Sequence, residues 1–309
     1  MIVTLTPNPA VDVTYTVPQL QHGRVHRVQQ VVESAGGKGV NVARVLAALG
    51  RPVCATGFLG GAAGETLEDL LLSEPVEQAW TLVSGQTRRT VNVVDERDAT
   101  IFNERGPQVT SHDWGRLTAG VLARLAAGDV LAVSGSTPPG TGDGDLSALV
   151  RSAVELGAAV VADTSGPGLL EVAAAGPACL KPNEEELLAA TGAADVLTGA
   201  RSLLARGAEA VLVSRGADGV LLVTGEEHWA ARPAETLTGN PTGAGDAAVA
   251  ALAVALADGA RGADLSAHLG EVVALSGAAV LRPTAGEVDL EAYARMLPTI
   301  QTEEIDAAS

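Results

Sequence analysis

Short apolar runs alternate with segments of helical spacing along most of the chain. The apolar runs predict buried strands at residues 2–5, 52–56, 130–133, 160–162, 179–180, 211–213 and 220–223. The segments between them place apolar residues three or four positions apart, which predicts helices at residues 40–49, 64–72, 147–156, 184–191 and 200–206. Strands that alternate with helices form a mainly parallel sheet with helices on both faces. The pattern therefore predicts the α/β class.

Two segments do not follow this alternation. Residues 11–32 and 85–106 alternate apolar and polar positions without helical spacing, which predicts exposed antiparallel strands that project from the main sheet. A few such strands are too small to form a stable domain alone, so they are expected to form a lid or a pairing surface. The predicted division is a core of residues 1–10, 33–84 and 107–309 with a β-lid of residues 11–32 and 85–106.

Charge and composition exclude several classes of partner. The chain has 309 residues and a formal net charge of −17, and 47% of its residues are hydrophobic. An acidic surface repels phosphate backbones and anionic membranes, so neither a nucleic acid nor a membrane is an expected partner. The longest apolar stretch, residues 247–257, is too short to span a bilayer, and the first residues lack the pattern of a signal peptide. A cytoplasmic location is expected.

Polar residues follow the carboxyl end of most predicted strands, where open α/β sheets bind their ligands. These segments are Thr6-Pro7-Asn8-Pro9-Ala10-Val11-Asp12, Ser134-Gly135-Ser136, Asp163-Thr164, Lys181-Pro182-Asn183 and Ser214-Arg215-Gly216-Ala217-Asp218-Gly219. Any one of them is an ordinary turn. Five along one edge of a sheet predict a ligand site.

Two glycine-rich segments precede helices, at residues 36–39 and 239–246. Free backbone N–H groups at a helix N-terminus bind anions by hydrogen bonding and through the helix dipole. Asp246 lies in the first turn of the second helix, where it is either a capping carboxylate or a base that accepts a hydroxyl proton beside a transferring phosphoryl group. Neither segment matches G-x-x-x-x-G-K-[ST] or G-x-G-x-x-G, which disfavours a Walker-type NTPase and a dinucleotide dehydrogenase.

The placement of basic residues also points to ligand loops. Of the 20 basic residues only Lys38 and Lys181 are lysines, and both lie in candidate ligand segments. A lysine is a compact charge on a flexible stem, which suits positions where the planar fork of arginine does not fit. The β-lid segments carry arginines that are candidates for bidentate capture of a phosphate or are simply solvated: Arg24, Arg27, Arg88, Arg89, Arg97 and Arg105. The solvated alternative is preferred for Arg89 and Arg97.

Asn183 and Glu186 are spaced for two roles. An amide and a carboxylate three residues apart at a helix start suit a water-rich Mg²⁺ site. The same spacing is typical of a capping box. Both roles are compatible with each other.

Two motifs together resemble a known family. Gly36-Gly37-Lys38-Gly39-Val40-Asn41-Val42-Ala43 resembles the first signature of the pfkB carbohydrate kinases, the ribokinase-like kinases, and Pro241-Thr242-Gly243-Ala244-Gly245-Asp246 resembles the second. The pair is more specific than either motif alone. Residues 4–12, 85–88 and 181–186 resemble the branch that acts on sugar phosphates, which includes 1-phosphofructokinases and tagatose-6-phosphate kinases.

The resemblance implies a fold and a reaction. The implied fold is a ribokinase-like three-layer α/β sandwich with a mainly parallel central sheet and a small β-strand lid. In this family the lid often contributes to a dimer interface, so a homodimer through the lid is one expected assembly. The implied reaction moves the γ-phosphoryl group of MgATP to a sugar hydroxyl, and the expected acceptor is D-fructose 1-phosphate, which becomes D-fructose 1,6-bisphosphate.

The resemblance also implies roles for single residues. Asp246 would be the general base, with Gly243, Ala244 and Gly245 as the anion hole. The sugar would be held by Asp12, Gly37, Lys38 and Asn41, with Arg88 on its phosphate and Ser136 nearby. The nucleotide would be lined by Lys181, Asn183, Ser214, Gly216, Asp218 and Gly219, and its base would reach the helix at residues 274–280. Mg²⁺ would be organised by Asn183 and Glu186, largely through water.

Departures from the family pattern leave alternatives open. Asn240-Pro241 stands where many ribokinase-like sequences have Asp-Thr, which favours the phosphofructokinase branch over ribokinase or adenosine kinase. Ile101 occupies a position that carries a phosphate-binding arginine in some 6-phosphofructokinases, and Arg105 lies four residues later, so the second phosphate contact is unassigned. The alternatives are a tagatose-6-phosphate kinase, a 6-phosphofructokinase and, more distantly, a non-catalytic sugar-phosphate-binding regulator.

Overall fold

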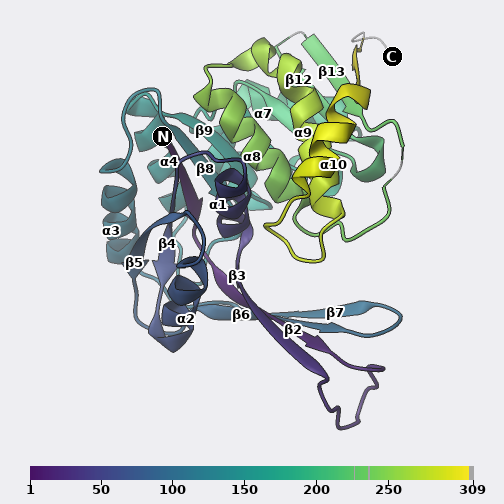
Figure 1. The fold of residues 1–309 in the computed structure, drawn as a ribbon. Helices are drawn as coiled ribbons and strands as arrows, with labels where there is room; N and C mark the ends of the chain where they lie inside the picture. Colours follow the sequence, from purple (N-terminus) through teal and green to yellow (C-terminus); the bar gives the residue numbers. More distant parts are fainter. Residues whose placement is uncertain (226, 236, 306–309) are drawn as a thin grey trace.

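A large twisted sheet forms the centre of the molecule. The computed structural model describes residues 1–225, 227–235 and 237–305, and within them this sheet has ten strands (Figure 1). Its strands are β1 (Ile2–Thr6), β4 (Val53–Leu59), β5 (Glu77–Leu82), β8 (Val130–Ser134), β9 (Ala159–Asp163), β10 (Cys179–Leu180), β11 (Val211–Ser214), β12 (Val220–Thr224), β13 (Glu227–Arg232) and β14 (Gln301–Glu304). Their order is β14-β13-β12-β11-β10-β9-β8-β1-β4-β5.

The pairing confirms the predicted mainly parallel sheet. All neighbours from β5 to β11 pair in parallel, and the pairs β11–β12, β12–β13 and β13–β14 are antiparallel. The central strands β1, β4, β8 and β9 are buried along their whole length, as expected for parallel strands covered on both faces. Their carboxyl ends therefore meet at one edge of the sheet.

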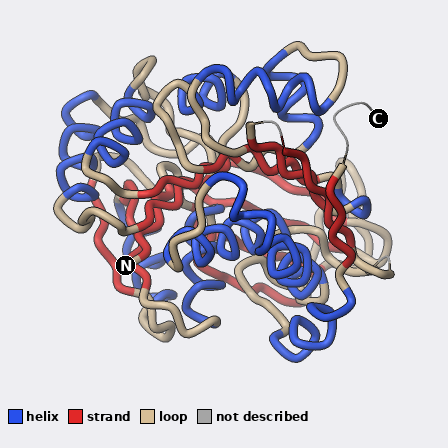
Figure 2. The backbone as a smooth tube through the Cα atoms, turned by 90° about the horizontal axis from the view of Figure 1, so that it is seen from above, coloured by secondary structure: helices blue, strands red, loops and turns tan. Residues whose placement is uncertain are grey.

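Helices cover both faces of the sheet, as the view along its edge shows (Figure 2). In β8 Val130 and Ala132 point into one core, and Leu131 and Val133 point into the other. The first core packs against α1 (Lys38–Ala48), α8 (Ala244–Ala257), α9 (Leu269–Val280) and α10 (Leu290–Met296). The second packs against α3 (Ser111–Leu122), α4 (Asp145–Glu155), α5 (Pro167–Ala173), α6 (Glu184–Thr191) and α7 (Val196–Arg206).

The most apolar of these helices is α8, which lies between the sheet, α1 and α9. It has 14 residues and is buried along most of its length. Within residues 1–225, 227–235 and 237–305, none of the helices combines the length and the apolarity that crossing a bilayer requires. Short 3₁₀ helices lie between these elements: η1 (Gly216–Asp218), η2 (Gly262–His268) and η3 (Leu297–Thr299).

A second, smaller sheet projects from the core (Figure 1). Its order is β3-β2-β6-β7, with bounds β2 (Ala10–Thr16), β3 (Gln30–Gly36), β6 (Arg88–Val94) and β7 (Ala99–Asn103). The projecting antiparallel pairs expected from the sequence are found in β2–β3 and β6–β7, but the central pair β2–β6 is parallel. This is because β2 and β6 both leave the core in the same direction, and β3 and β7 lie on the outer sides.

One face of the small sheet is anchored on α2 (Gly61–Leu71). Val11 and Val13 of β2 pack with Leu67 and Leu71 of α2 in a third, smaller core. Farther along the same face Phe102 of β7 pairs with Val91 of β6 and is 56% exposed. The small sheet therefore has a covered base and an exposed apolar tip.

Candidate active site

A cavity of about 740 Å³ lies at the carboxyl edge of the large sheet, beneath the small sheet. The N-termini of α1 and α8 point into it, which places free backbone N–H groups on its wall. The structure brings most of the predicted site residues to this cavity. They are Asp12, Gly37, Lys38, Asn41, Arg88, Lys181, Asn183, Glu186, Ser214, Gly216, Gly219, Gly243, Ala244, Gly245 and Asp246.

A second cavity of about 530 Å³ adjoins the first. Ser136 lines this smaller cavity, together with Asn8 and Arg105. Arg88 lines both cavities, so it stands where they meet. Asp218 lines neither of them, although Gly216 in the same 3₁₀ turn lines the larger one.

The carboxylate of Asp246 lies at the start of α8 and is 5% exposed. Asn41 Nδ2 donates a hydrogen bond of 2.8 Å to its Oδ2. Burial raises the pKa of Asp246 to about 7, and the nearby Asp163 carboxylate adds to the shift against the opposing effects of Asn41, Lys38 and Lys181. A carboxylate with a pKa near neutrality is suited to accept a proton from a hydroxyl group.

The turn before α8 forms a cradle for an anion. Gly243 has φ +91 and ends the turn at the N-cap of α8. Because a side chain there would be strained, glycine is required by the backbone. A Cβ at Gly245 would lie 3.4 Å from Lys181 Nζ, so this position faces the lysine ammonium across the cradle. Backbone N–H groups and a lysine ammonium thus converge beside Asp246.

Asp163 links the two lysines of the chain. Its Oδ1 lies 3.0 Å from Lys38 Nζ and its Oδ2 lies 3.2 Å from Lys181 Nζ. Burial opposes ionisation of Asp163, but the charges of Lys181 and Lys38 outweigh it and lower the pKa of its carboxyl group. The buried carboxylate therefore stays ionised and orients both ammonium groups toward the cavity.

Asp12 and Arg88 stand on the polar face of the small sheet. Arg88 Nε donates to the Asn8 carbonyl oxygen at 3.1 Å, and its Nη1 lies 3.3 Å from Thr90 Oγ1. Burial raises the pKa of Asp12, while Thr90 and the guanidinium of Arg88 oppose that shift. A Cβ at Gly36 would overlap the Asp12 carboxyl group, which explains the glycine at the end of β3.

Asn183 and Glu186 form the predicted capping box. The Glu186 N–H donates to Asn183 Oδ1 at 2.7 Å, and the Asn183 N–H donates to Glu186 Oε2 at 3.0 Å. Both residues also line the larger cavity, and Glu186 Oε1 lies 3.9 Å from Lys38 Nζ. One oxygen of Glu186 thus closes the cap while the other faces the site.

The far end of the larger cavity is apolar. Its lining comes from β12, α9 and the segment before α8, and it consists of Val220, Pro233, Leu237, Val273, Gly277 and Val280. Such a slot suits a flat, apolar ring system. Of this apolar lining, the family resemblance led us to expect only the helix at residues 274–280.

Comparison with known proteins identifies the family of the chain and the type of reaction at this site. The family model for pfkB family carbohydrate kinases matches residues 6–292. The chain belongs to the pfkB carbohydrate kinase family. The kinase is accordingly a phosphotransferase with an alcohol group as acceptor, as expected from the two glycine-rich motifs.

Individual relatives agree along nearly the whole kinase. A 1-phosphofructokinase of Haloferax volcanii is 39% identical over 270 residues, which are 85% of this chain and 87% of that protein. A tagatose-6-phosphate kinase of Staphylococcus epidermidis is 34% identical over 83% of this chain and 85% of that protein. The crystal structure of phosphofructokinase-2 from Escherichia coli in complex with potassium superposes with a TM-score of 0.89 and 30% identity, covering 96% and 98% of the two chains. The predicted ribokinase-like fold is confirmed.

The structure adds residues that the sequence pattern did not single out as site residues. Asp163 is the main one, since it contacts both lysines and influences Asp246. Its position at the carboxyl end of a buried strand was the available signal. Thr90 and Asn103 also line the larger cavity from the small sheet of the kinase. In these strands polar residues alternate with apolar ones throughout, so the sequence did not distinguish these two from the other polar residues.

Proposed function

We propose that the protein is an ATP-dependent sugar-phosphate kinase that converts D-fructose 1-phosphate to D-fructose 1,6-bisphosphate. The observation that carries the proposal is the buried Asp246 carboxylate, with a pKa of about 7, beside the anion cradle that residues 243–245 form at the N-terminus of α8. A base poised near neutrality next to a phosphate cradle is what phosphoryl transfer to an alcohol requires.

In the proposed reaction Asp246 accepts the proton of the 6-hydroxyl group as its oxygen attacks the γ-phosphorus of ATP. The new O–P bond forms while the bond from the γ-phosphorus to the bridging oxygen breaks, and ADP leaves. The N–H groups of Gly243, Ala244 and Gly245, at the N-terminus of α8, would offset charge on the transferring group.

The sugar phosphate is proposed to bind between the small sheet and α1. Asp12, Gly37, Lys38 and Asn41 would contact the sugar from the larger cavity. Arg88, which lines both cavities, would pair with the existing phosphate, and Ser136 would contact it from the smaller cavity. This arrangement keeps the acceptor phosphate apart from the one being transferred.

ATP is proposed to occupy the rest of the larger cavity, with its base in the apolar slot. Lys181, Asn183, Ser214, Gly216 and Gly219 line its path. Asp218 would act from the adjoining turn, since it does not line the cavity itself.

Mg²⁺ is proposed to accompany ATP near Asn183 and Glu186. The free oxygen of Glu186 faces the site while the other closes the helix cap, which fits a metal held largely through water and phosphate. Among the described residues no group of three His, Cys, Asp or Glu side chains forms a cage for a metal. The ion would neutralise charge on the phosphates.

The second candidate is a tagatose-6-phosphate kinase, which the relative from Staphylococcus epidermidis favours. A 6-phosphofructokinase is less well supported, because Ile101, an uncharged residue, lines the larger cavity from β7. Arg105 lines the smaller cavity and is the available candidate for a second phosphate contact.

A coupled ADP-release assay with MgATP tests the proposal. Fructose 1-phosphate, fructose 6-phosphate, tagatose 6-phosphate and unphosphorylated fructose are compared at matched concentrations. We expect kcat/KM for fructose 1-phosphate to exceed the others by about 100-fold or more. Preference for a 6-phosphate would keep the mechanism and change the substrate, and binding without ADP release would point to a regulator.

The small sheet is proposed to act as a lid and to pair two copies of the chain. Its polar face, with Asp12, Thr90 and Asn103, lines the cavity, so closure would exclude water from the transfer. Its opposite face is apolar and exposed at the tip, where a second copy would cover Val31 and Phe102. A cytoplasmic location, where sugar phosphates and ATP occur together, completes the proposal.

A further inference from the structure

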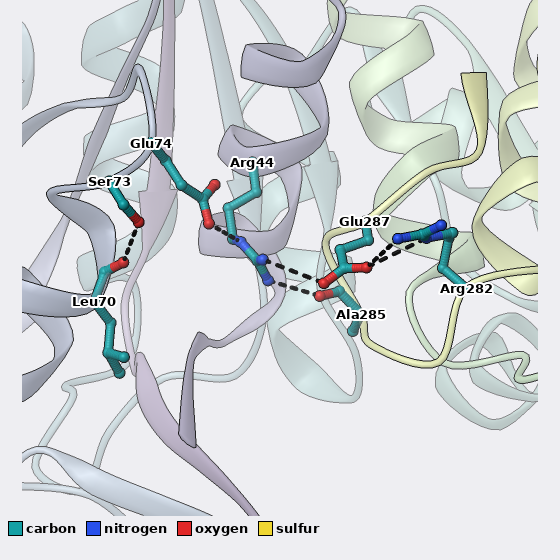
Figure 3. A network of polar contacts seen from close by, with 7 residues as sticks. All are labelled: Arg44, Leu70, Ser73, Glu74, Arg282, Ala285 and Glu287. Atoms are coloured by element: carbon teal, nitrogen blue, oxygen red, sulfur yellow. Dashed lines mark hydrogen bonds and ion pairs between the residues drawn. The ribbon is translucent and has the colours of Figure 1, made fainter. Parts of the chain in front are cut away.

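Arg44 connects three segments that lie far apart in the sequence (Figure 3). It belongs to α1, and its side chain is 12% exposed. Its Nε donates to Glu74 Oε1 at 2.6 Å, and its Nη1 donates to the Ala285 carbonyl oxygen at 2.8 Å. Its Nη2 lies 3.9 Å from Glu287 Oε1. A single guanidinium thus joins α1, the segment after α2 and the loop between α9 and α10.

That loop, residues 281–289, lies directly behind the anion cradle. A Cβ at Gly243 would lie 3.0 Å from Ala285 Cα, and Asn240 Nδ2 donates to the Pro283 carbonyl oxygen at 2.9 Å. The loop also braces itself, because Arg282 Nη2 pairs with Glu287 Oε2 at 3.0 Å (Figure 3). Any shift of the loop would therefore be transmitted to the turn that ends at Gly243.

The same loop passes close to Asn41, the hydrogen-bond partner of the proposed base. Gly286 has φ +80, and a Cβ there would lie 2.9 Å from Arg44 Nη1 and 3.1 Å from Asn41 Oδ1. Asn41 in turn donates to Asp246. Arg44 lies one helical turn after Asn41, so its contacts with the loop link α1 to the segment that packs behind the turn before α8.

We propose that Arg44 is a positioning residue for phosphoryl transfer. It holds the 281–289 loop against α1 and thereby keeps the anion cradle in register with Asn41 and Asp246. Arginine suits this role because its rigid fork satisfies Glu74 and the Ala285 carbonyl at once, whereas a lysine ammonium lacks that fork. The inference rests on the proposed function of the same site.

Arg51 provides a matched control. Its Nη1 and Nη2 donate to the Asp258 carboxylate at 3.0 and 2.8 Å. Asp258 follows the last residue of α8, so this ion pair joins the α1 and α8 region at the end remote from the cradle. Removing either arginine costs an ion pair made by α1 or the residues just after it, but only Arg44 contacts the loop behind the cradle.

The experiment compares Arg44→Met, Arg44→Lys and Arg51→Met, using the acceptor that the wild-type protein phosphorylates. Arg44→Met is expected to lower kcat by about tenfold to 100-fold, because small misplacements of reacting groups are costly. KM for the acceptor is expected to stay within about threefold in Arg44→Lys, since Arg44 lines neither cavity and lysine keeps the charge that favours ionised Asp12. Arg44→Lys should recover part of kcat, and Arg51→Met should leave both constants near those of the wild type.

Hydrogen exchange gives a readout that needs no acceptor. Peptides covering residues 240–246 and 281–289 should exchange faster in Arg44→Met than in the wild type or in Arg51→Met. If the wild type phosphorylates none of the four acceptors, the proposed function has failed, and the exchange comparison still tests the role of Arg44.

Three results would overturn the inference: an unchanged kcat in Arg44→Met, a rise in KM alone, or equal exchange in all proteins. Should Arg44→Met fail to fold, Arg44→Lys carries the same test, because it too must lose kcat without losing affinity for the acceptor.

Discussion

Asp246 shows how surroundings give an ordinary carboxylate a special pKa. Burial and the neighbouring Asp163 disfavour its charge, while Asn41 and the two lysines favour it. The balance gives Asp246 a pKa close to neutral pH. At that pH a large fraction of the molecules carry the ionised carboxylate, and this carboxylate still binds a proton readily. Burial of this kind also has a cost in stability, and the two effects can be measured separately.

The pH dependence of the reaction should report this group. Because Asp246 must be ionised to accept a proton, kcat/KM is expected to be highest above pH 7 and to fall as the pH decreases through about 7. Asp246→Asn, which keeps the shape and removes the base, should lower kcat by about 100-fold or more. Its residual rate should lack this limb of the profile. A wild-type profile that is flat from pH 6 to 8 would argue against Asp246 as the base.

The stability of Asp246→Asn should rise although its activity falls. Between pH 3.8, the ordinary pKa of an aspartate, and about pH 7, the folded protein binds a proton at Asp246 that the unfolded chain does not. This group therefore makes stability fall as the pH rises through that window. Asp246→Asn is expected to be more stable than the wild type at pH 8, by about 1 to 3 kcal/mol, and the gain should shrink at pH 5. Urea unfolding at both pH values measures it, and a destabilised variant at pH 8 would contradict the pKa argument.

Single residues differ in how far the sequence could identify them. Lys38 and Lys181 stood out because the chain otherwise uses arginine, and both line the cavity. Asp163 was noted only as part of a polar segment after a strand and was given no role, because an aspartate at a strand end is common. Its importance arises from the two lysines that fold onto it from distant segments, which local sequence does not reveal.

At the scale of elements, the start of α6 serves two purposes. The capping box of Asn183 and Glu186 satisfies backbone donors that would otherwise be unpaired, and the same two side chains line the cavity. The carboxylate of Glu186 therefore both caps the helix and faces the cavity, and a substitution can remove one of these roles while keeping the other.

Glu186→Gln is expected to keep the cap, because glutamine also accepts from the N-cap N–H, while it removes the charge facing the site. The melting temperature should stay close to that of the wild type, and the Mg²⁺ concentration for half-maximal rate should rise by about tenfold. Titrating MgCl₂ at fixed ATP measures this. As the control, Glu186→Ala should show the same metal effect with an added loss of stability. An unchanged Mg²⁺ requirement in both variants would assign Glu186 to the cap alone.

Strands were predictable from the sequence where both of their faces are buried. All the predicted buried runs became strands, because parallel strands covered on both faces leave continuous apolar runs. Strands β5, β13 and β14 were not predicted, since β5 is largely half-buried, β13 is only partly buried and β14 is exposed throughout. Their pairing comes from the neighbouring strand rather than from their own pattern. The parallel pairing of β2 with β6 likewise depends on where both leave the core.

At the scale of the molecule, the small sheet separates a polar face over the site from an apolar face. The apolar face runs from the base on α2 to an exposed tip, with Val31 55% and Phe102 56% exposed. Exposed apolar surface of this kind is typical of an interaction site. The proposed second copy would bury it.

Sedimentation velocity should therefore find a dimer. Phe102→Glu places a charge in the apolar tip and is expected to weaken dimerisation by at least about tenfold. Leu156→Glu is the control, because Leu156 is 42% exposed at the end of α4, on the core and away from the small sheet. A monomeric wild type, or equal weakening by both variants, would contradict pairing through this face.

The scarcity of lysine has a practical consequence for chemical labelling. Besides the terminal amine, an acylating reagent finds only Lys38 and Lys181 in the whole sequence, and both ammonium groups meet at Asp163. The side chain of Lys38 is 43% exposed and that of Lys181 is 3% exposed. A reagent with no selectivity of its own would therefore reach the site through Lys38, and protection of Lys38 from acylation would report ligand occupancy once labelling of the terminal amine is subtracted.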